Sequence, residues 1–203
     1  QGARDAAVMT SGALNTVAAS LMKIANDIRW LASGPTSGLH EIRLPAVQPG
    51  SSIMPGKVNP VIPEALMMAA ARVMGNHVTI TVAGSRGNFE LNVMMPVLAH
   101  ALLESIQLLA GAARAFSDRC VTGLEANPDR CRQLLERNPA IATALNLVLG
   151  YDLASEVAKE AAREGISVRD VVLRRDLLPP GKIDEALDVR GMTDGGLGEG
   201  SKR

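Results

Sequence analysis

Apolar and small side chains recur near the start of the chain at the spacing of a helical bundle. Between residues 7 and 31 they form two series, at heptad positions a and d. The a series is Ala7, Leu14, Leu21 and Ile28, and the d series is Thr10, Val17, Ile24 and Leu31. A seam of about 25 residues at this spacing predicts one long helix whose core face packs nearly parallel to other helices, partly in other subunits.

Two more long helices are predicted, one after Pro60 and one after Pro96. Proline suits the first helical turn, because its missing N–H needs no partner there. Glu64 lies near the positive end of the first of these helices. The predicted inner faces are Ala65, Leu66, Ala69, Val73 and Ile80 on one helix, and Val97, Leu98, Ala101, Leu102, Leu109, Ala112 and Phe116 on the other. Between the helices, Glu90 and Asn92 are expected to form hydrogen bonds in a buried turn.

The pattern changes at residues 125–128, Glu-Ala-Asn-Pro, after which the periodic segments are short. Helices are predicted at residues 129–137, 140–149, 153–164, 168–174 and 183–187. Ser167 is the predicted N-cap of the fourth. The glycine-rich residues 195–200 predict a frayed tail. We therefore predict an all-α protein, in which residues 1–128 belong to a long-helix bundle domain and residues 129–203 form a small helical domain with a flexible tail.

The composition agrees with packed helices and argues against several kinds of partner. Apolar residues make up 47% of the chain but aromatic residues only 2%, which favours closely packed helices over a sheet sandwich. The 21 basic and 21 acidic residues cancel, so no global field attracts nucleic acid or an anionic membrane. No uninterrupted apolar run reaches the length of a membrane span, roughly 18 residues. Cys120 and Cys131 are too few for a zinc ribbon or an iron–sulfur cluster, and two reduced cytosolic thiols are expected.

Residues 33–60 show no sustained helical or strand period, and a connection of that length is uncommon unless it is functional. Residues 50–60 combine glycines that permit unusual backbone angles with prolines that restrict their neighbours, which suits a lid. Lys57 can pair with a carboxylate, and Asn59 can both donate and accept hydrogen bonds. Ser51 and Ser52 offer hydroxyls and N–H groups to a developing oxyanion. This set predicts a site for a small anionic molecule.

Residues 50–59 also fill every fixed position of the pattern G-S-S-x-M-P-x-K-x-N, the signature of the fumarase/aspartase superfamily, which the chain therefore resembles. Residues 2–5 and 87–96, Asn146 and residues 150–151 extend the resemblance. The run Asn-Phe-Glu-Leu-Asn-Val-Met-Met-Pro at 88–96 is similar to class II fumarases, whereas aspartases tend to carry glutamines there. Two positions depart from the usual family segment: Thr36 replaces an arginine, and His40 stands where a small residue is common.

The resemblance implies reversible hydration of fumarate to (S)-malate through an aci-carboxylate intermediate, without a metal or redox cofactor. It assigns the catalytic base to Ser51 and stabilisation of the intermediate to Ser52. Lys57 and Asn59 would bind the substrate, and Glu64 would hold the loop lysine in place. The family assembles as homotetramers whose sites are shared between subunits. We therefore expect a tetramer, located in the cytoplasm or, in a eukaryote, the mitochondrial matrix.

The histidines do not supply the family's catalytic acid, because its motif is not found in this chain. We interpret His40 as a solvated loop residue rather than a general base, His77 as a surface or interface residue, and His100 as a packed or interface residue. The family's Thr/Ser/Asn-rich substrate-binding segment is not found either, and the chain does not begin with Met. We thus expect a C-terminal portion of a longer enzyme, inactive alone. The alternatives are an aspartate ammonia-lyase or another superfamily lyase, and an inactive helical association module.

Overall fold

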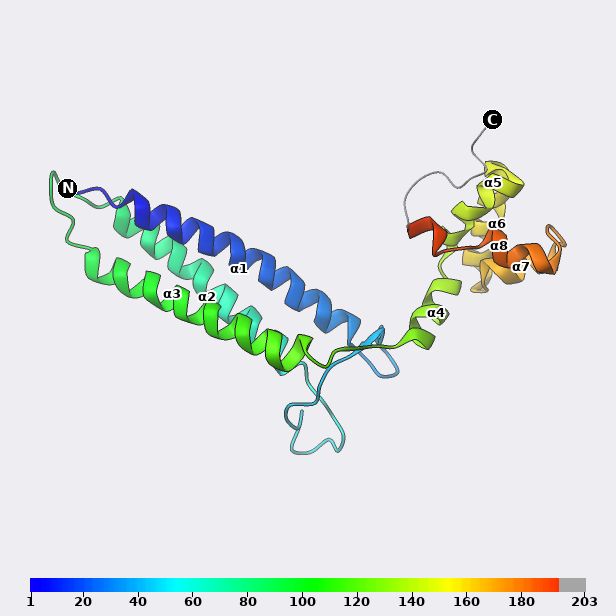
Figure 1. Ribbon diagram of the computed structural model, residues 1–203, viewed down its shortest axis with the longest axis horizontal. Helices are drawn as coiled ribbons and strands as arrows, with labels where there is room; N and C mark the ends of the chain where they lie inside the picture. Colours follow the sequence, from blue (N-terminus) through cyan, green and yellow to red (C-terminus); the bar gives the residue numbers. More distant parts are fainter. Residues whose placement is uncertain (194–203) are drawn as a thin grey trace. The chain divides into compact units, whose positions relative to one another are not determined.

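The computed structural model describes residues 1–193 and contains two compact units, the first being Gln1–Asn127 and the second beginning at Pro128. In the first unit three long helices lie side by side (Figure 1). They are α1 (Asp5–Leu31), α2 (Val61–Gly84) and α3 (Met95–Phe116), and a π-helical turn (Ser117–Val121) continues α3. Helix α2 lies against both α1 and α3, and the predicted helical fold is confirmed.

The face of α1 that packs within the chain differs from the predicted seam. Ala18 and Ala25 are fully buried, and Ser11 nearly so; each lies four residues after an a position. The a positions are half-buried beside them, but at the d positions Val17 and Ile24 are 48% and 44% exposed. Within the chain the a side of the seam and the residues four positions after it face the core, and packing of the d side against other subunits stays a prediction. A straight helix places residues i, i+4 and i+7 on one face, and small side chains there allow close approach.

The inner faces of α2 and α3 agree with the prediction at most positions. On α2, Leu66, Val73 and Ile80 are buried, as predicted. Ala65 is exposed, so its predicted burial is wrong, and Ala70 is buried instead. On α3, Val97 is exposed, so its predicted burial is wrong. The buried α3 residues are Leu98, Ala101, Ser105, Leu109 and Phe116. These faces form three small hydrophobic clusters along the bundle, each shared between helices.

Buried polar side chains tie α2 to α3. Asn76 Nδ2 donates to Glu104 Oε2 at 2.7 Å and lies 3.2 Å from Ser105 Oγ and 3.3 Å from the Ala101 carbonyl. The hydrogen bond from Asn76, followed by those from Arg72, lowers the pKa of the Glu104 carboxyl. These contacts satisfy the buried amide nitrogen of Asn76 and fix the register of α2 and α3.

The turn between α2 and α3 is held by Asn92. Its Nδ2 donates to the Ala83 carbonyl at 3.0 Å, and its Oδ1 accepts from Met94 N at 2.9 Å. The hydrogen bonding predicted for this turn is confirmed at Asn92, which is buried. Glu90 and Leu91 are exposed, so their predicted burial is wrong.

Helix α3 and its continuation, Met95–Val121, are together long and apolar enough to cross a membrane by length and composition. The sequence expectation considered only uninterrupted apolar runs, and charged residues such as Glu104 interrupt this one. Apolar helices at the core of a bundle share this length and composition. In this structure α3 packs against α2.

The second unit is a group of short helices. They are α4 (Pro128–Glu136), a 3-10 turn (Pro139–Leu145), α5 (Asn146–Leu149), α6 (Tyr151–Glu164), α7 (Val168–Arg174), α8 (Pro180–Ala186) and a 3-10 turn (Gly191–Thr193). Ser167 is the N-cap of α7, as predicted, and forms a reciprocal capping box with Asp170. The predicted frayed tail lies outside the described residues.

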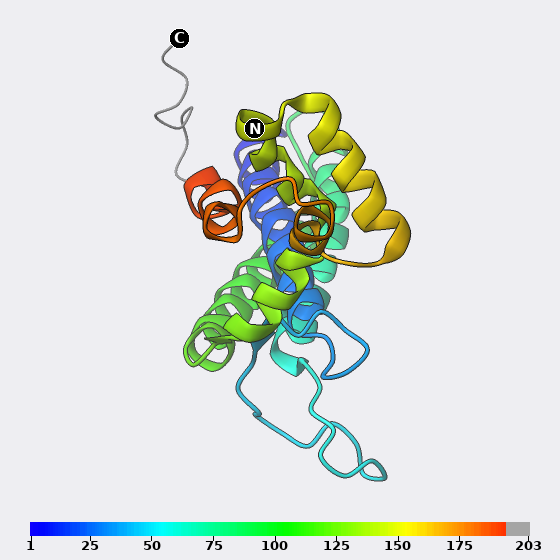
Figure 2. The same cartoon turned by 90° about the vertical axis from the view of Figure 1, so that its right-hand side faces the viewer.

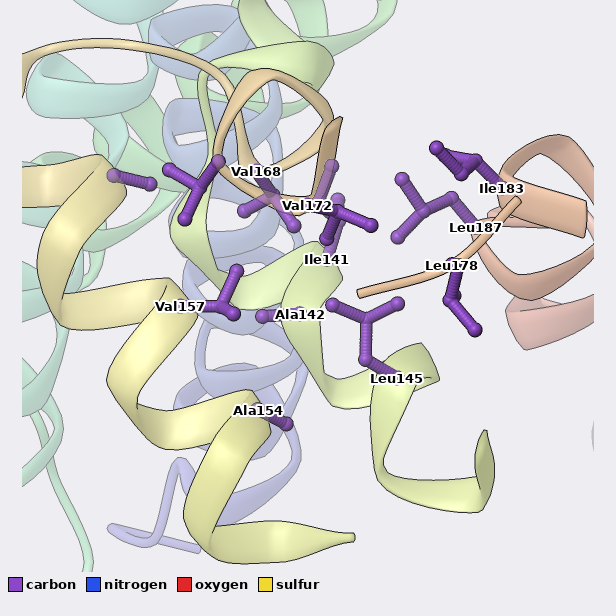
Figure 3. Packing of buried hydrophobic residues seen from close by; sticks show 12 residues of the cluster. Ile141, Ala142, Leu145, Ala154, Val157, Val168, Val172, Leu178, Ile183 and Leu187 are labelled. Atoms are coloured by element: carbon purple, nitrogen blue, oxygen red, sulfur yellow. The ribbon is translucent and has the colours of Figure 1, made fainter. Parts of the chain in front are cut away.

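The core of this unit is aliphatic and tightly enclosed. Leu145, Val157 and Val172 are fully buried and point toward one another between α6, α7 and the 3-10 turn (Figure 3). On its surface Arg174 pairs with Glu160 and Glu164 and links α7 to α6. Hydrogen bonds from Arg174 and Arg163 lower the pKa of the Glu164 carboxyl.

Replacing Leu145 with alanine should destabilise this unit by about 2–5 kcal/mol, because the site is enclosed and leaves a cavity. Leu147 is a matched control two residues away and is 71% exposed. Leu147→Ala should change the free energy of unfolding by less than about 0.5 kcal/mol. Urea unfolding followed by circular dichroism measures both, and equal effects of the two variants would contradict the described core.

Candidate active site

The segment between α1 and α2 forms a long loop at one end of the bundle (Figures 1 and 2). Its first half is tied to the chain after α3. A short strand, β1 (Ile42–Arg43), pairs antiparallel with β2 (Glu125–Ala126). Asn127 adds two bonds: its Nδ2 donates to the His40 carbonyl at 3.0 Å, and its N–H donates to the Glu41 carbonyl at 2.8 Å. These contacts therefore fix the first half of the loop to the segment that follows α3.

The second half of the loop closes on itself through Gly50. The Gly50 N–H donates to the Lys57 carbonyl at 2.7 Å, and Asn59 Nδ2 donates to the Gly50 carbonyl at 3.0 Å. A Cβ atom at Gly50 would lie only 2.7 Å from the Lys57 carbonyl oxygen. Glycine is thus required at this position, where the backbone of Gly50 meets that of Lys57; we call this point the neck of the loop. Asn59 supports the loop as well as offering a polar group to a ligand.

The two signature serines have different environments. Ser51 is half-buried, and its Oγ accepts hydrogen bonds from the N–H groups of Ile53 and Met54, both at 3.2 Å. Ser52 is exposed, and its hydroxyl makes no hydrogen bond with residues 1–193. Two N–H donors directed at one oxygen favour negative charge on that oxygen. Of the two serines, Ser51 is therefore the one whose oxygen is better placed to carry a negative charge.

A cavity of about 650 Å³ lies between the end of α1, the loop and the start of α2. Its charged and polar wall includes Arg29, His40, Arg43, Lys57, Asn59 and Glu64. Three permanent cations face one carboxylate, so the cavity suits an anionic ligand. A smaller hollow of about 490 Å³ adjoins Ser51, and Lys57 lines both. The structure thus places Lys57, Asn59 and Glu64 around one cavity and Ser51 beside it, while Ser52 lines neither.

Glu64 pairs with a different cation from the one predicted. Its Oε1 lies 3.7 Å from Arg29 Nη2, and within residues 1–193 the Lys57 ammonium makes no ion pair. The predicted pairing of Glu64 with Lys57 is therefore absent from this structure. The physical reason is placement, because Arg29 lies on α1 against the first turn of α2, whereas Lys57 lies on the exposed loop.

Arg29, Arg43 and His40 are the cavity residues that sequence reasoning missed. Arg29 lies in the last turn of α1, among the final residues of the apolar seam, where a basic residue has an ordinary dipole role and gives no separate signal. His40 is a half-buried loop residue with a φ of 54°, and it lines the cavity. His77 lies between helices, with its Nδ1 3.0 Å from Ser11 Oγ, and His100 is exposed.

Comparison with known proteins places this geometry in a family. The profile of the family described as "Lyase" matches residues 2–75, and that of "Fumarase C C-terminus" matches residues 141–194. The chain is 53% identical over 196 residues to "Fumarate hydratase class II 2" of Pseudomonas aeruginosa and 52% identical over 196 residues to "Fumarate hydratase class II" of Mycobacterium tuberculosis. The chain belongs to the class II fumarase family.

The match covers most of this chain but less than half of each relative. It includes 97% of the chain and 43% of the Pseudomonas protein, and 95% of the chain and 41% of the Mycobacterium protein. The chain therefore spans about two fifths of the length of these fumarase relatives. The signature loop, α1 and the first part of α2 fall within the first matched profile, and most of the second unit falls within the other.

Solved structures of the family share the fold. The crystal structure of a class II fumarase from Schistosoma mansoni superposes with a TM-score of 0.84 at 40% identity, over 92% of this chain and 39% of that one. A fumarate lyase:delta crystallin from Brucella melitensis gives a TM-score of 0.87 at 48% identity, over 92% of this chain and 40% of that one. The long-helix bundle followed by a small helical unit is thus a fumarase-family arrangement.

Gly50→Ala should open the neck of the loop, because the added Cβ displaces the Lys57 carbonyl and breaks its hydrogen bond with the Gly50 N–H. Loss of one such bond should raise the rate of tryptic cleavage after Lys57 by about 2- to 10-fold. Gly181→Ala is the matched control, since a Cβ there meets no atom within 4 Å. Mass spectrometry of the early digest measures both rates. An unchanged rate for Gly50→Ala would contradict the described neck.

Proposed function

We propose that this chain supplies the signature-loop portion of a fumarate hydratase, which interconverts fumarate and (S)-malate. One observation carries the proposal: Lys57 lines both a cationic cavity, which Asn59 also lines, and a smaller hollow lined by Ser51, whose Oγ accepts two backbone N–H groups. The names of the relatives at about 50% identity, fumarate hydratase class II, support the same assignment. The cavity, at about 650 Å³, is large enough for a four-carbon dicarboxylate.

The difficult step in malate dehydration is removal of the C3 proton, because that carbon lies beside a carboxylate rather than a more acidifying group. The electron pair left on C3 becomes tolerable when it spreads into the carboxylate as an aci-carboxylate. Lys57 and Asn59 are proposed to hold that carboxylate as its charge grows. Elimination then expels the C2 hydroxyl as water, and the acid that protonates this hydroxyl is proposed to come from a segment outside this chain.

Ser51 is proposed to accept the C3 proton. A free serine is far too weak an acid to ionise near neutral pH, so its alkoxide requires strong local stabilisation. The N–H groups of Ile53 and Met54 supply part of it in the structure, and the N-terminal end of α2 is a further source. Ser52 is proposed to donate its N–H or hydroxyl to the aci-carboxylate after the loop closes over the substrate.

An assay of substrate choice tests the proposed function. The full-length protein is mixed with (S)-malate or with aspartate, and the ultraviolet absorbance of fumarate is followed. Fumarate should appear from malate and not from aspartate. Activity on aspartate alone would favour the ammonia-lyase alternative, and activity on neither would favour the helical association module. The cytoplasmic location stays a prediction.

We further propose a homotetramer with sites shared between subunits. Large apolar side chains remain exposed along the outer faces of the three bundle helices: Val17, Ile24, Met68, Val78, Leu103 and Ile106. So many exposed large apolar side chains on one bundle favour an interaction surface. Light scattering of the full-length protein should therefore give four times the subunit mass, and a stable monomer would contradict the assembly.

The two serines should respond differently to alanine. Ser51→Ala is expected to lower kcat by about 10³-fold or more with little change in substrate affinity, since the group acts in the transition state. Ser52→Ala should lose about 10²-fold, the usual effect of removing one oxyanion donor. Proton exchange at C3 of malate, followed separately from dehydration, identifies the base. Parental exchange in Ser51→Ala would transfer the role to a group outside this chain.

A further inference from the structure

We infer that His40 and Arg43 form a second anion subsite in the cavity, in addition to Lys57 and Asn59, for a carboxylate or phosphate group. The inference rests on the proposed function only in that it concerns the same cavity. Both residues lie on the first half of the loop, outside the signature pattern, and His40 stands where the family segment commonly has a small residue.

His40 is held in a backbone conformation that residues with a Cβ atom rarely adopt. Its φ is 54°, in the left-handed region, which glycine enters at least cost. Its N–H donates to the Ser33 carbonyl at 2.7 Å, and its carbonyl accepts from Asn127 Nδ2 at 3.0 Å. Backbone strain of this kind concentrates at functional sites. A histidine at this position therefore points to a use for its imidazole.

The imidazole of His40 lies against Gly34, and both residues line the cavity. A Cβ atom added at Gly34 would lie 3.0 Å from His40 Cβ and 3.4 Å from its Nδ1. The ring thus occupies space that a side chain at position 34 would crowd, and its place is set before a ligand arrives. Because an imidazole carries an N–H donor in either protonation state, His40 can bond an oxyanion directly.

Arg43 follows His40 by three residues and adds a permanent charge to the same wall. It lies in β1, where pairing with β2 fixes its backbone opposite Glu125. Within residues 1–193 neither Arg43 nor Glu125 forms an ion pair, and Arg43 lines the cavity. A guanidinium presents its N–H donors in a fork that matches the oxygens of a carboxylate or phosphate. Arg43 and His40 together supply charge and directed donors for one oxyanion.

The cavity has room and charge for this group beside the proposed substrate. Its volume of about 650 Å³ lies in the range of pockets for drug-sized ligands and exceeds what a four-carbon dicarboxylate fills. Lys57 and Asn59 come from the second half of the loop, so the two subsites belong to different parts of the wall. Because the described wall carries three permanent cations and one carboxylate, positive charge remains for a further anion.

Titration of the full-length protein with inorganic phosphate, by calorimetry at constant ionic strength, tests the subsite. His40→Gly and Arg43→Gln should each raise the Kd for phosphate about tenfold, because each removes a donor to an anion. Lys57→Met should raise it less than either. His100→Gln and Lys23→Gln are the matched controls, since both residues are exposed and lie away from the cavity, and they should keep the parental Kd.

A Kd that rises in Lys57→Met but stays parental in His40→Gly and Arg43→Gln would overturn the inference. The melting temperature of His40→Gly separates binding from a structural role. Glycine adopts this φ without strain, which offsets its greater freedom in the unfolded chain, so the melting temperature should be retained while the Kd rises. A lower melting temperature with a parental Kd would remove His40 from the subsite. Arg43 is exposed, and its variant keeps the test decisive if His40→Gly does not fold.

A second titration, with (S)-malate at saturation, distinguishes the two sources of the oxyanion. If the subsite takes a carboxylate of malate itself, malate should raise the Kd for phosphate in the parental protein. If it takes a separate anion, phosphate should bind beside malate with its Kd retained.

The outcomes separate this inference from the proposed function. A protein that binds phosphate through His40 and Arg43 but converts no malate contradicts the proposed function and supports the subsite. A protein that converts malate, with a phosphate Kd unaffected by both variants, contradicts only the subsite.

Discussion

The close packing of α1 against α2 is the constraint on which the candidate site depends. Small side chains make this approach possible: Ala18, Ala25 and Ala70 are fully buried where the helices meet. A larger residue at any of these positions would force the helices apart, because cores are packed too tightly to absorb extra volume without strain. The packing sets the end of α1 beside the start of α2, and both ends of the long loop are fixed by it. A chain with almost no aromatic residues builds its rigid frame in this way.

The loop combines that rigid frame with local freedom. Its first half is bound to the segment after α3 through Asn127 and the two short strands, and its neck is closed by the hydrogen bond between Gly50 and Lys57. Between these anchors the tip carries Ser51 and Ser52 and is bonded mainly to itself. Such a segment can close over a substrate while the cavity wall on the helices stays in place. In the proposed reaction the loop carries both the binding groups, Lys57 and Asn59, and the serines, while the helices supply a fixed part of the cavity wall.

The sequence predicted what local pattern determines and missed what depends on contact between distant segments. Helix positions followed from periodicity and from proline and glycine, and the preference for Ser51 over Ser52 agrees with the hydrogen bonds at Ser51. On α1 the heptad seam does not say which half packs inside the chain and which half is left for other subunits, and only the structure shows that Val17 and Ile24 are exposed within the chain. The partner of Glu64 was missed because Arg29 lies 35 positions earlier in the sequence, and only the helix packing brings them together.

The central claim is that the signature loop holds Lys57 and Asn59 at a cationic cavity, where they are proposed to bind a substrate carboxylate. A crystal structure of the full-length protein with (S)-malate bound tests it most directly. The account predicts a malate carboxylate oxygen within hydrogen-bonding distance of Lys57 Nζ and Asn59 Nδ2. A complex in which malate binds away from the signature loop would contradict it.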